Sequence, residues 1–169
     1  LGNQILLSSL DALQHLQRRG LNILMAVNVS KRQLFIRSFA DQLAEEASHR
    51  GLQPGQLVLE VTESVALNDV ERGADRVQEL RKAGFLIAID DFGTGYSSLS
   101  QLHEMNADEL KIDISFVRRL HEPAGRSMMQ AIVNMAHALG LNTVAEGVET
   151  QDVADILGRI GVNCLQGYL

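Results

Sequence analysis

The chain is poor in several residue types that support particular classes of protein. Its 169 residues contain no tryptophan, two prolines and a single cysteine, Cys164. One cysteine excludes an internal disulfide bond and fits a reducing compartment, and we expect Cys164 to be a small buried residue. The five histidines form no His-x-His or His-x-x-x-His pair. Any metal site must therefore use oxygen ligands, which favours a hard cation.

Long apolar runs and excess positive charge are also missing. No apolar stretch approaches the roughly 18 residues that span a bilayer, and we expect no signal peptide. The net charge of −6 argues against nonspecific binding to DNA or RNA, but it is compatible with one anionic ligand held through metal ions. We therefore expect a cytoplasmic domain, whose parent protein could still carry a membrane anchor elsewhere.

The apolar residues, 46% of the chain, are arranged as short strands that alternate with amphipathic helices. This alternation predicts one α/β domain with a parallel sheet covered on both faces. A doubly wound sheet and an incomplete β/α barrel both fit the pattern. The expected strands are 23–27, 57–61, 85–89, 110–114, 142–145 and 162–165, and the expected helices are 4–19, 39–50, 69–82, 98–104, 125–139 and 151–159.

Polar residues stand at or near the end of each expected strand. In parallel β/α folds these ends meet at one edge, so the side chains should converge. Carboxylate and amide oxygens are the ligands that Mg²⁺ and Mn²⁺ prefer, which predicts a metal site. The converging residues are Asn28, Glu60, Asp90, Asp91, Lys111, Glu146 and Gln166.

The stretch IAIDDFGTGYSSL places two adjacent acids directly after an apolar strand. Their mutual repulsion would be relieved by cations in the predicted site. The segment 93–98 is similar to a dinucleotide-binding loop, but a third glycine is missing and the preceding acids would repel a pyrophosphate. Lys111 and Asp113 should share one strand face, either as an ion pair or as a lysine that the aspartate holds beside a phosphate.

A set of motifs resembles the EAL family, the bacterial phosphodiesterases that cleave cyclic di-GMP. The matching stretches are VNVS (27–30), LEVTES (59–64), IDDFGTGYSSL (89–99), LKID (110–113), AEGVET (145–150) and QGY (166–168). The resemblance implies a (β/α)8 TIM-like barrel with an antiparallel first strand, of which residues 1–169 would supply roughly the last six strand–helix units.

The Glu-Ala-Leu segment that names the family is absent from the sequence. We therefore expect a partial domain, truncated at both ends, that lacks one metal-binding carboxylate and is not a stable unit alone. Smaller departures are Ile114, where the family often has Arg, and Val153, where it often has Gln.

The resemblance also implies roles for individual residues. The metal ligands would be Asn28, Glu60, Asp90, Asp91 and Glu146. Gln166 would lie at a metal-bound water, while Lys111, with Asp113, would face the attacking water and the scissile phosphate. Among these, Lys111, Glu146 and Asp90 would be catalytic. Glu63 and Glu149 would anchor the loop 91–97, which with the following helix is linked to homodimer contacts and regulation.

The activity implied is hydrolysis of cyclic di-GMP to linear pGpG by water activated by two Mg²⁺ or Mn²⁺ ions. Such domains act in bacterial second-messenger signalling, including biofilm control, often beside sensory or GGDEF domains. An inactive receptor for cyclic di-GMP is the alternative, and a hydrolase for another phosphodiester is a third. The intact ligand set and DDFGTG loop favour the enzyme.

Overall fold

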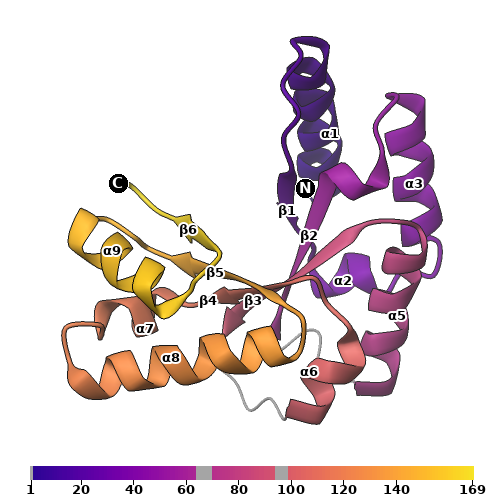
Figure 1. Ribbon diagram of the computed structural model, residues 1–169. Helices are drawn as coiled ribbons and strands as arrows, with labels where there is room; N and C mark the ends of the chain where they lie inside the picture. The colour runs from indigo at the N-terminus through magenta and orange to yellow at the C-terminus, as the bar shows by residue number, and fades with distance from the viewer. Residues whose placement is uncertain (1, 64–69, 94–98) are drawn as a thin grey trace.

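The computed structural model describes residues 2–63, 70–93 and 99–169. Within these ranges it contains one sheet whose parallel strands follow their order in the chain. A doubly wound sheet requires a reversal of strand order, so the sequential order excludes that alternative. The sheet is instead curled into a half-barrel (Figure 1). Its strands are β1 (Met25–Asn28), β2 (Leu57–Thr62), β3 (Leu86–Phe92), β4 (Glu109–Ile112), β5 (Asn142–Glu146) and β6 (Cys164–Gln166).

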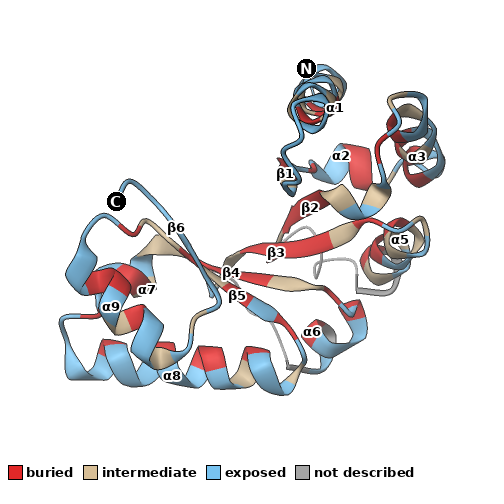
Figure 2. Cartoon of the chain, turned by 45° about the horizontal axis from the view of Figure 1, so that its top comes forward, coloured by how far each residue is buried: buried red, intermediate tan, exposed pale blue. Residues whose placement is uncertain are grey.

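Helices pack against the outer, convex side of this sheet (Figure 2). The predicted helices are all found, although the predicted starts of two of them, Asp69 and Ser98, lie outside the described residues. Three short elements were not predicted, because a single helical turn is too short to show a periodic pattern: α2, η1 and α7. The full set is α1 (Gly2–Arg18), α2 (Lys31–Leu34), α3 (Phe39–His49), the 3-10 helix η1 (Pro54–Gln56), α5 (Val70–Lys82), α6 (Leu99–Met105), α7 (Ile114–Arg118), α8 (Pro123–Ala138) and α9 (Gln151–Ile160).

The alternation of side chains along each strand separates the core from the inner face. Leu59 and Val61 of β2 are fully buried in the hydrophobic cluster under the helices. Glu60, between them, points to the other side, as Lys111 of β4 does. Parallel pairing keeps residues at one level aligned, for example Glu60 with Ala88. The polar strand ends therefore lie on the concave face, and the apolar core lies outside it.

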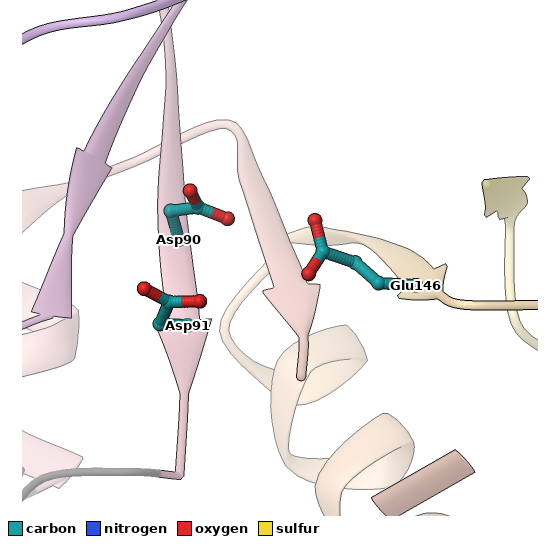
Figure 3. Close-up of side chains that lie close together, drawn as sticks. All are labelled: Asp90, Asp91 and Glu146. Atoms are coloured by element: carbon teal, nitrogen blue, oxygen red, sulfur yellow. The ribbon is translucent and has the colours of Figure 1, made fainter. Parts of the chain in front are cut away.

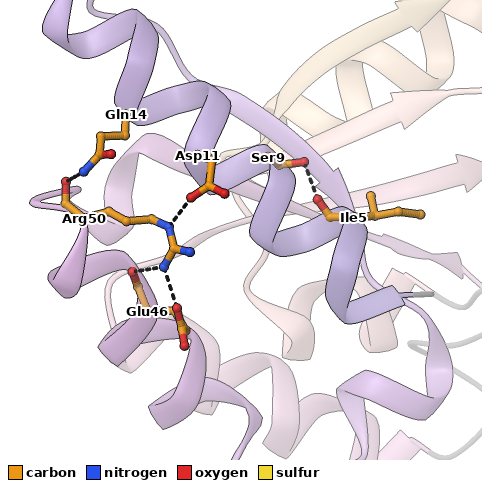
Figure 4. Close-up of polar contacts among 6 residues, drawn as sticks. All are labelled: Ile5, Ser9, Asp11, Gln14, Glu46 and Arg50. Atoms are coloured by element: carbon orange, nitrogen blue, oxygen red, sulfur yellow. Dashed lines mark hydrogen bonds and ion pairs between the residues drawn. The ribbon is translucent and has the colours of Figure 1, made fainter.

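The first helix is attached to α3 by a polar clamp (Figure 4). Arg50 Nε donates to Asp11 Oδ1 at 2.7 Å, and Arg50 Nη1 donates to the Glu46 carbonyl at 3.0 Å. Gln14 Nε2 donates to the Arg50 carbonyl at 2.7 Å. These contacts supplement the packing of Leu10 and Leu13, both fully buried. None of the helices in the described ranges combines the length and apolarity needed to cross a membrane.

The expectation that Cys164 is buried is wrong. Cys164 is exposed and pairs in register with Val144 at the start of β6. In the described chain β6 is an end strand, so the sheet covers it from one side only. A small apolar residue at this position is therefore left open to solvent.

Asn163 ties the start of β6 to β5. Its Oδ1 accepts from Thr143 N and from Thr143 Oγ1, both at 2.9 Å, and its own N–H donates to Thr143 Oγ1 at 3.1 Å. Thr143 is fully buried, so loss of the Asn163 side chain leaves two buried hydrogen-bond donors without their acceptor. We expect Asn163→Ala to lower the free energy of unfolding by about 1–3 kcal/mol, measured by urea denaturation. Asn134→Ala, on the exposed side of α8, is the control, and equal losses would contradict the role of Asn163.

Candidate metal centre

The ends of β3 and β5 bring three carboxylates together. One oxygen each from Asp90, Asp91 and Glu146 lies within 4.8 Å of the others (Figure 3). Neighbouring residues of a regular strand point to opposite faces. Here the pairing of β3 with β4 shifts register between Ile89 and Phe92, and Asp91 has a left-handed backbone with φ of 55°. This bulge allows both adjacent carboxylates to reach the same cluster.

Lys111 lies among the carboxylates of three different strands. Its Nζ is 2.7 Å from Glu146 Oε1, 2.8 Å from Glu60 Oε1 and 2.9 Å from Asp90 Oδ1. The lysine side chain is only 6% exposed. Burial lowers the pKa of Lys111, but the hydrogen-bonding carboxylates outweigh burial and raise the pKa above its ordinary value. The ammonium is therefore charged at every physiological pH.

The carboxylates keep unused capacity for a cation. Asp90 Oδ1 is buried, and the Lys111 ammonium at 2.9 Å balances its charge within the described chain. Burial raises the pKa of Asp91, and the neighbouring Asp90 and Asp113 carboxylates raise it further. The close group of Asp90, Asp91 and Glu146 carboxylates fits a divalent cation, since the donors are all hard oxygens.

Glu63 contacts the start of the loop that follows β3. Its Oε2 accepts a hydrogen bond from Gly93 N at 2.9 Å, and the side chain is buried. This contact holds the chain just after the two aspartates. Residues 94–97, the remainder of the predicted dimer loop, lie outside the described residues.

The prediction that Lys111 and Asp113 share a strand face is wrong. β4 ends at Ile112, and Asp113 is the N-cap of α7, where its carboxylate accepts from Ser115 N at 2.9 Å. Hydrogen bonding to the Ser115 side chain, and then to the Ser115 backbone, lowers the pKa of Asp113 below its ordinary range. In the described chain, the acids that pair with Lys111 are those of β2, β3 and β5.

Three further predicted residues lie around the cluster without a described side-chain contact to it. Asn28 is the last residue of β1, pairs in register with Glu60 and is exposed. Gln166 ends β6, pairs in register with Glu146 and accepts from Val148 N through its carbonyl. Glu149 is exposed between β5 and α9. Asn28 and Gln166 therefore lie at the same level of the sheet as Glu60 and Glu146, respectively.

Glycines follow the acids at the ends of both β3 and β5, and the sequence motifs alone gave them no structural role. Gly93 follows the β3 acids and has φ of 96°, and Gly147 follows Glu146 and has φ of 69°. A glycine within two residues of an acidic strand end is a visible signal, because glycine adopts positive φ angles that strain other residue types.

Comparison with known proteins decides the family. The family model for the EAL domain matches residues 1–169. The chain belongs to the EAL domain family. Relatives of this EAL chain include the bifunctional diguanylate cyclase/cyclic di-GMP phosphodiesterase MucR of Pseudomonas aeruginosa, which is 42% identical over 146 residues. That match covers 86% of this chain and 21% of MucR.

A second relative of this EAL chain is the cyclic di-GMP phosphodiesterase PdeR of Escherichia coli, 35% identical over 170 residues. That match covers 100% of this chain and 26% of PdeR. The chain therefore spans about a fifth to a quarter of the length of these relatives.

Solved structures show the same fold. The MucR phosphodiesterase in complex with c-di-GMP superposes with a TM-score of 0.94 at 37% identity, covering 99% of this chain and 69% of that one. Klebsiella pneumoniae BlrP1 in a complex with manganese and cyclic di-GMP superposes with a TM-score of 0.86 at 30% identity, covering 98% of this chain and 43% of that one. The half-barrel is therefore the TIM-barrel-like α/β fold of EAL domains.

Lys111 offers a test of whether the cluster binds cations. Lys111→Met removes the positive charge and leaves Glu60, Asp90 and Glu146 to repel one another. In EDTA we expect a loss of about 3–5 kcal/mol in the free energy of unfolding. Saturating Mn²⁺ should restore much of this loss, because a bound cation replaces the charge.

The measurement is chemical denaturation with and without Mn²⁺. Lys82→Met, at the exposed end of α5, is the matched control and should respond equally in both conditions. If the loss in Lys111→Met were the same with and without Mn²⁺, the cation would not bind among these carboxylates.

Proposed function

We propose that this EAL domain is a metal-dependent phosphodiesterase that hydrolyses cyclic di-GMP to linear pGpG, with Mg²⁺ or Mn²⁺ as cofactor. The observation that carries the proposal is the cluster of Asp90, Asp91 and Glu146 around a buried lysine, at the strand ends of a chain that the family model covers from end to end. The names of MucR and PdeR as cyclic di-GMP phosphodiesterases support the choice of substrate.

The residues that would hold the cations are Asn28, Glu60, Asp90, Asp91 and Glu146. Two divalent cations would supply positive charge to the phosphoryl oxygens and lower the pKa of the attacking water. Asp90 belongs both to the close carboxylate group and to the acids that Lys111 contacts.

Lys111 acts as an electrostatic group. Hydrogen bonds with three carboxylates raise its pKa above the ordinary value despite burial, which suits the side chain to supplying positive charge. The same three contacts fix the direction of the ammonium. A fixed positive charge beside the scissile phosphate stabilises the negative charge that develops there, without reorganisation during the reaction.

The remaining residues would assist from the rim of the site. Gln166 and Asp113 would position water and substrate, and Glu63 and Glu149 would hold the loop after β3. The hydrogen bond from Gly93 N to Glu63 Oε2 supports the loop-holding role of Glu63. We further propose a homodimer through this loop and α6, and a cytoplasmic setting beside sensory or GGDEF domains.

The decisive variant is Asp90→Asn, which keeps the shape of the side chain and removes its charge. We expect turnover of cyclic di-GMP to fall at least about 100-fold, because a buried metal ligand is lost. The fold should remain, as judged by circular dichroism. The measurement is conversion of cyclic di-GMP to pGpG by the full-length protein in Mn²⁺, followed by chromatography.

Asp152→Asn, exposed in the first turn of α9, is the matched control and should keep wild-type activity. An Asp90→Asn protein with the wild-type rate would refute the metal assignment. Tight binding of cyclic di-GMP by the wild-type protein without turnover would instead identify a receptor.

A further inference from the structure

The short helix α7 contacts the backbone next to both carboxylate-bearing strand ends. A Cβ atom added to Gly147 would lie 2.3 Å from Ile114 Cδ1 and Cγ1, and one added to Gly93 would lie 2.4 Å from Phe116 Cε2. These distances mean that each glycine backbone is already in close contact with a side chain of α7. Gly147 directly follows Glu146, and Gly93 is two residues beyond Asp91.

The contact at Gly147 lies directly after the end of β5. Glu146 is the last residue of β5, and the chain then turns through the left-handed conformation of Gly147. The next residue, Val148, is buried and donates its N–H to the Gln166 carbonyl at 3.0 Å. Because Gly147 has no side chain, packing by its neighbours restrains the peptide that carries Glu146. Ile114 supplies that packing from the α7 side.

The helix is itself well anchored. The Asp113 side chain caps its first turn through Ser115 N. Val117, one turn after Ile114, is 3% exposed and belongs to the hydrophobic core. A side chain on α7 is therefore held firmly enough to position the strand ends that it touches.

We propose that α7 braces the carboxylate cluster, and that Ile114 is a positioning residue that sets Glu146 by packing on Gly147. This inference rests on the proposed function, because it concerns the same cation site. Residues that orient metal ligands typically change metal affinity by 10-fold to 100-fold when they are mutated. The Glu146 carboxylate would be displaced without this brace, while its charge would be unchanged.

The first experiment measures Mn²⁺ affinity of the metal-free, full-length protein by isothermal titration calorimetry. We expect Ile114→Ala to weaken Mn²⁺ binding on the order of 10-fold. Leu43→Ala, in the core on α3 and not on α7, is the control. It should lower stability to urea more than Ile114→Ala does, yet leave Mn²⁺ affinity within about twofold, because core packing does not orient the ligand. Equal Mn²⁺ affinity in wild type and Ile114→Ala would overturn the proposal.

A double substitution tests the contact itself. Gly147→Ala should weaken Mn²⁺ binding, because its new methyl group overlaps Ile114 and its φ is unfavourable for alanine. Adding Ile114→Ala removes the overlapping Cγ1 and Cδ1 atoms, so the double variant should bind Mn²⁺ more tightly than Gly147→Ala alone. Losses that simply add would show that Ile114 and Gly147 act independently, against the proposal.

Failure of the proposed function is separable from failure of the brace. If the wild-type protein binds Mn²⁺ but does not hydrolyse cyclic di-GMP, the phosphodiesterase assignment fails, while the pattern of Mn²⁺ affinities still decides the role of Ile114. If the wild-type protein binds no Mn²⁺, both proposals are overturned.

Discussion

The attraction between one buried ammonium and several carboxylates is the interaction on which the site depends. Lys111 of β4 meets Glu60 of β2, Asp90 of β3 and Glu146 of β5, all within 3 Å. Without this cation the acids would be desolvated and would repel one another in a largely buried space. The lysine is thus a structural counter-ion for the three acids. It also ties four successive strands together at their carboxyl ends.

The backbone near the end of β3 departs from regular strand geometry beside this cluster. Asp91 lies in a left-handed conformation, which costs a non-glycine residue about 1–2 kcal/mol. The same bulge turns two adjacent carboxylates toward one site, which a regular strand does not allow. Glycines then follow both acidic strand ends, where φ is positive and side chains of α7 approach closely. Strain and close packing are thus concentrated where ligands must be placed accurately.

Charge and apolar packing are divided between the two faces of the sheet. On β2, Leu59 and Val61 join the core beneath the helices, while Glu60 faces the concave side. The large outer core stabilises the fold, so the inner face is free to carry groups that weaken it. This division explains how the fold tolerates several buried acids.

The sequence by itself determined the alternation of strands and helices, the acids at the strand ends and the family, because these follow from the spacing of apolar residues and from short motifs. Tertiary structure decided the rest. The sequential strand order excluded a doubly wound sheet, the bulge directed Asp91 into the cluster, Asp113 became a helix cap, and Cys164 was left exposed on an end strand. Strand order, register and coverage depend on contacts between residues far apart in the chain, which local patterns do not encode.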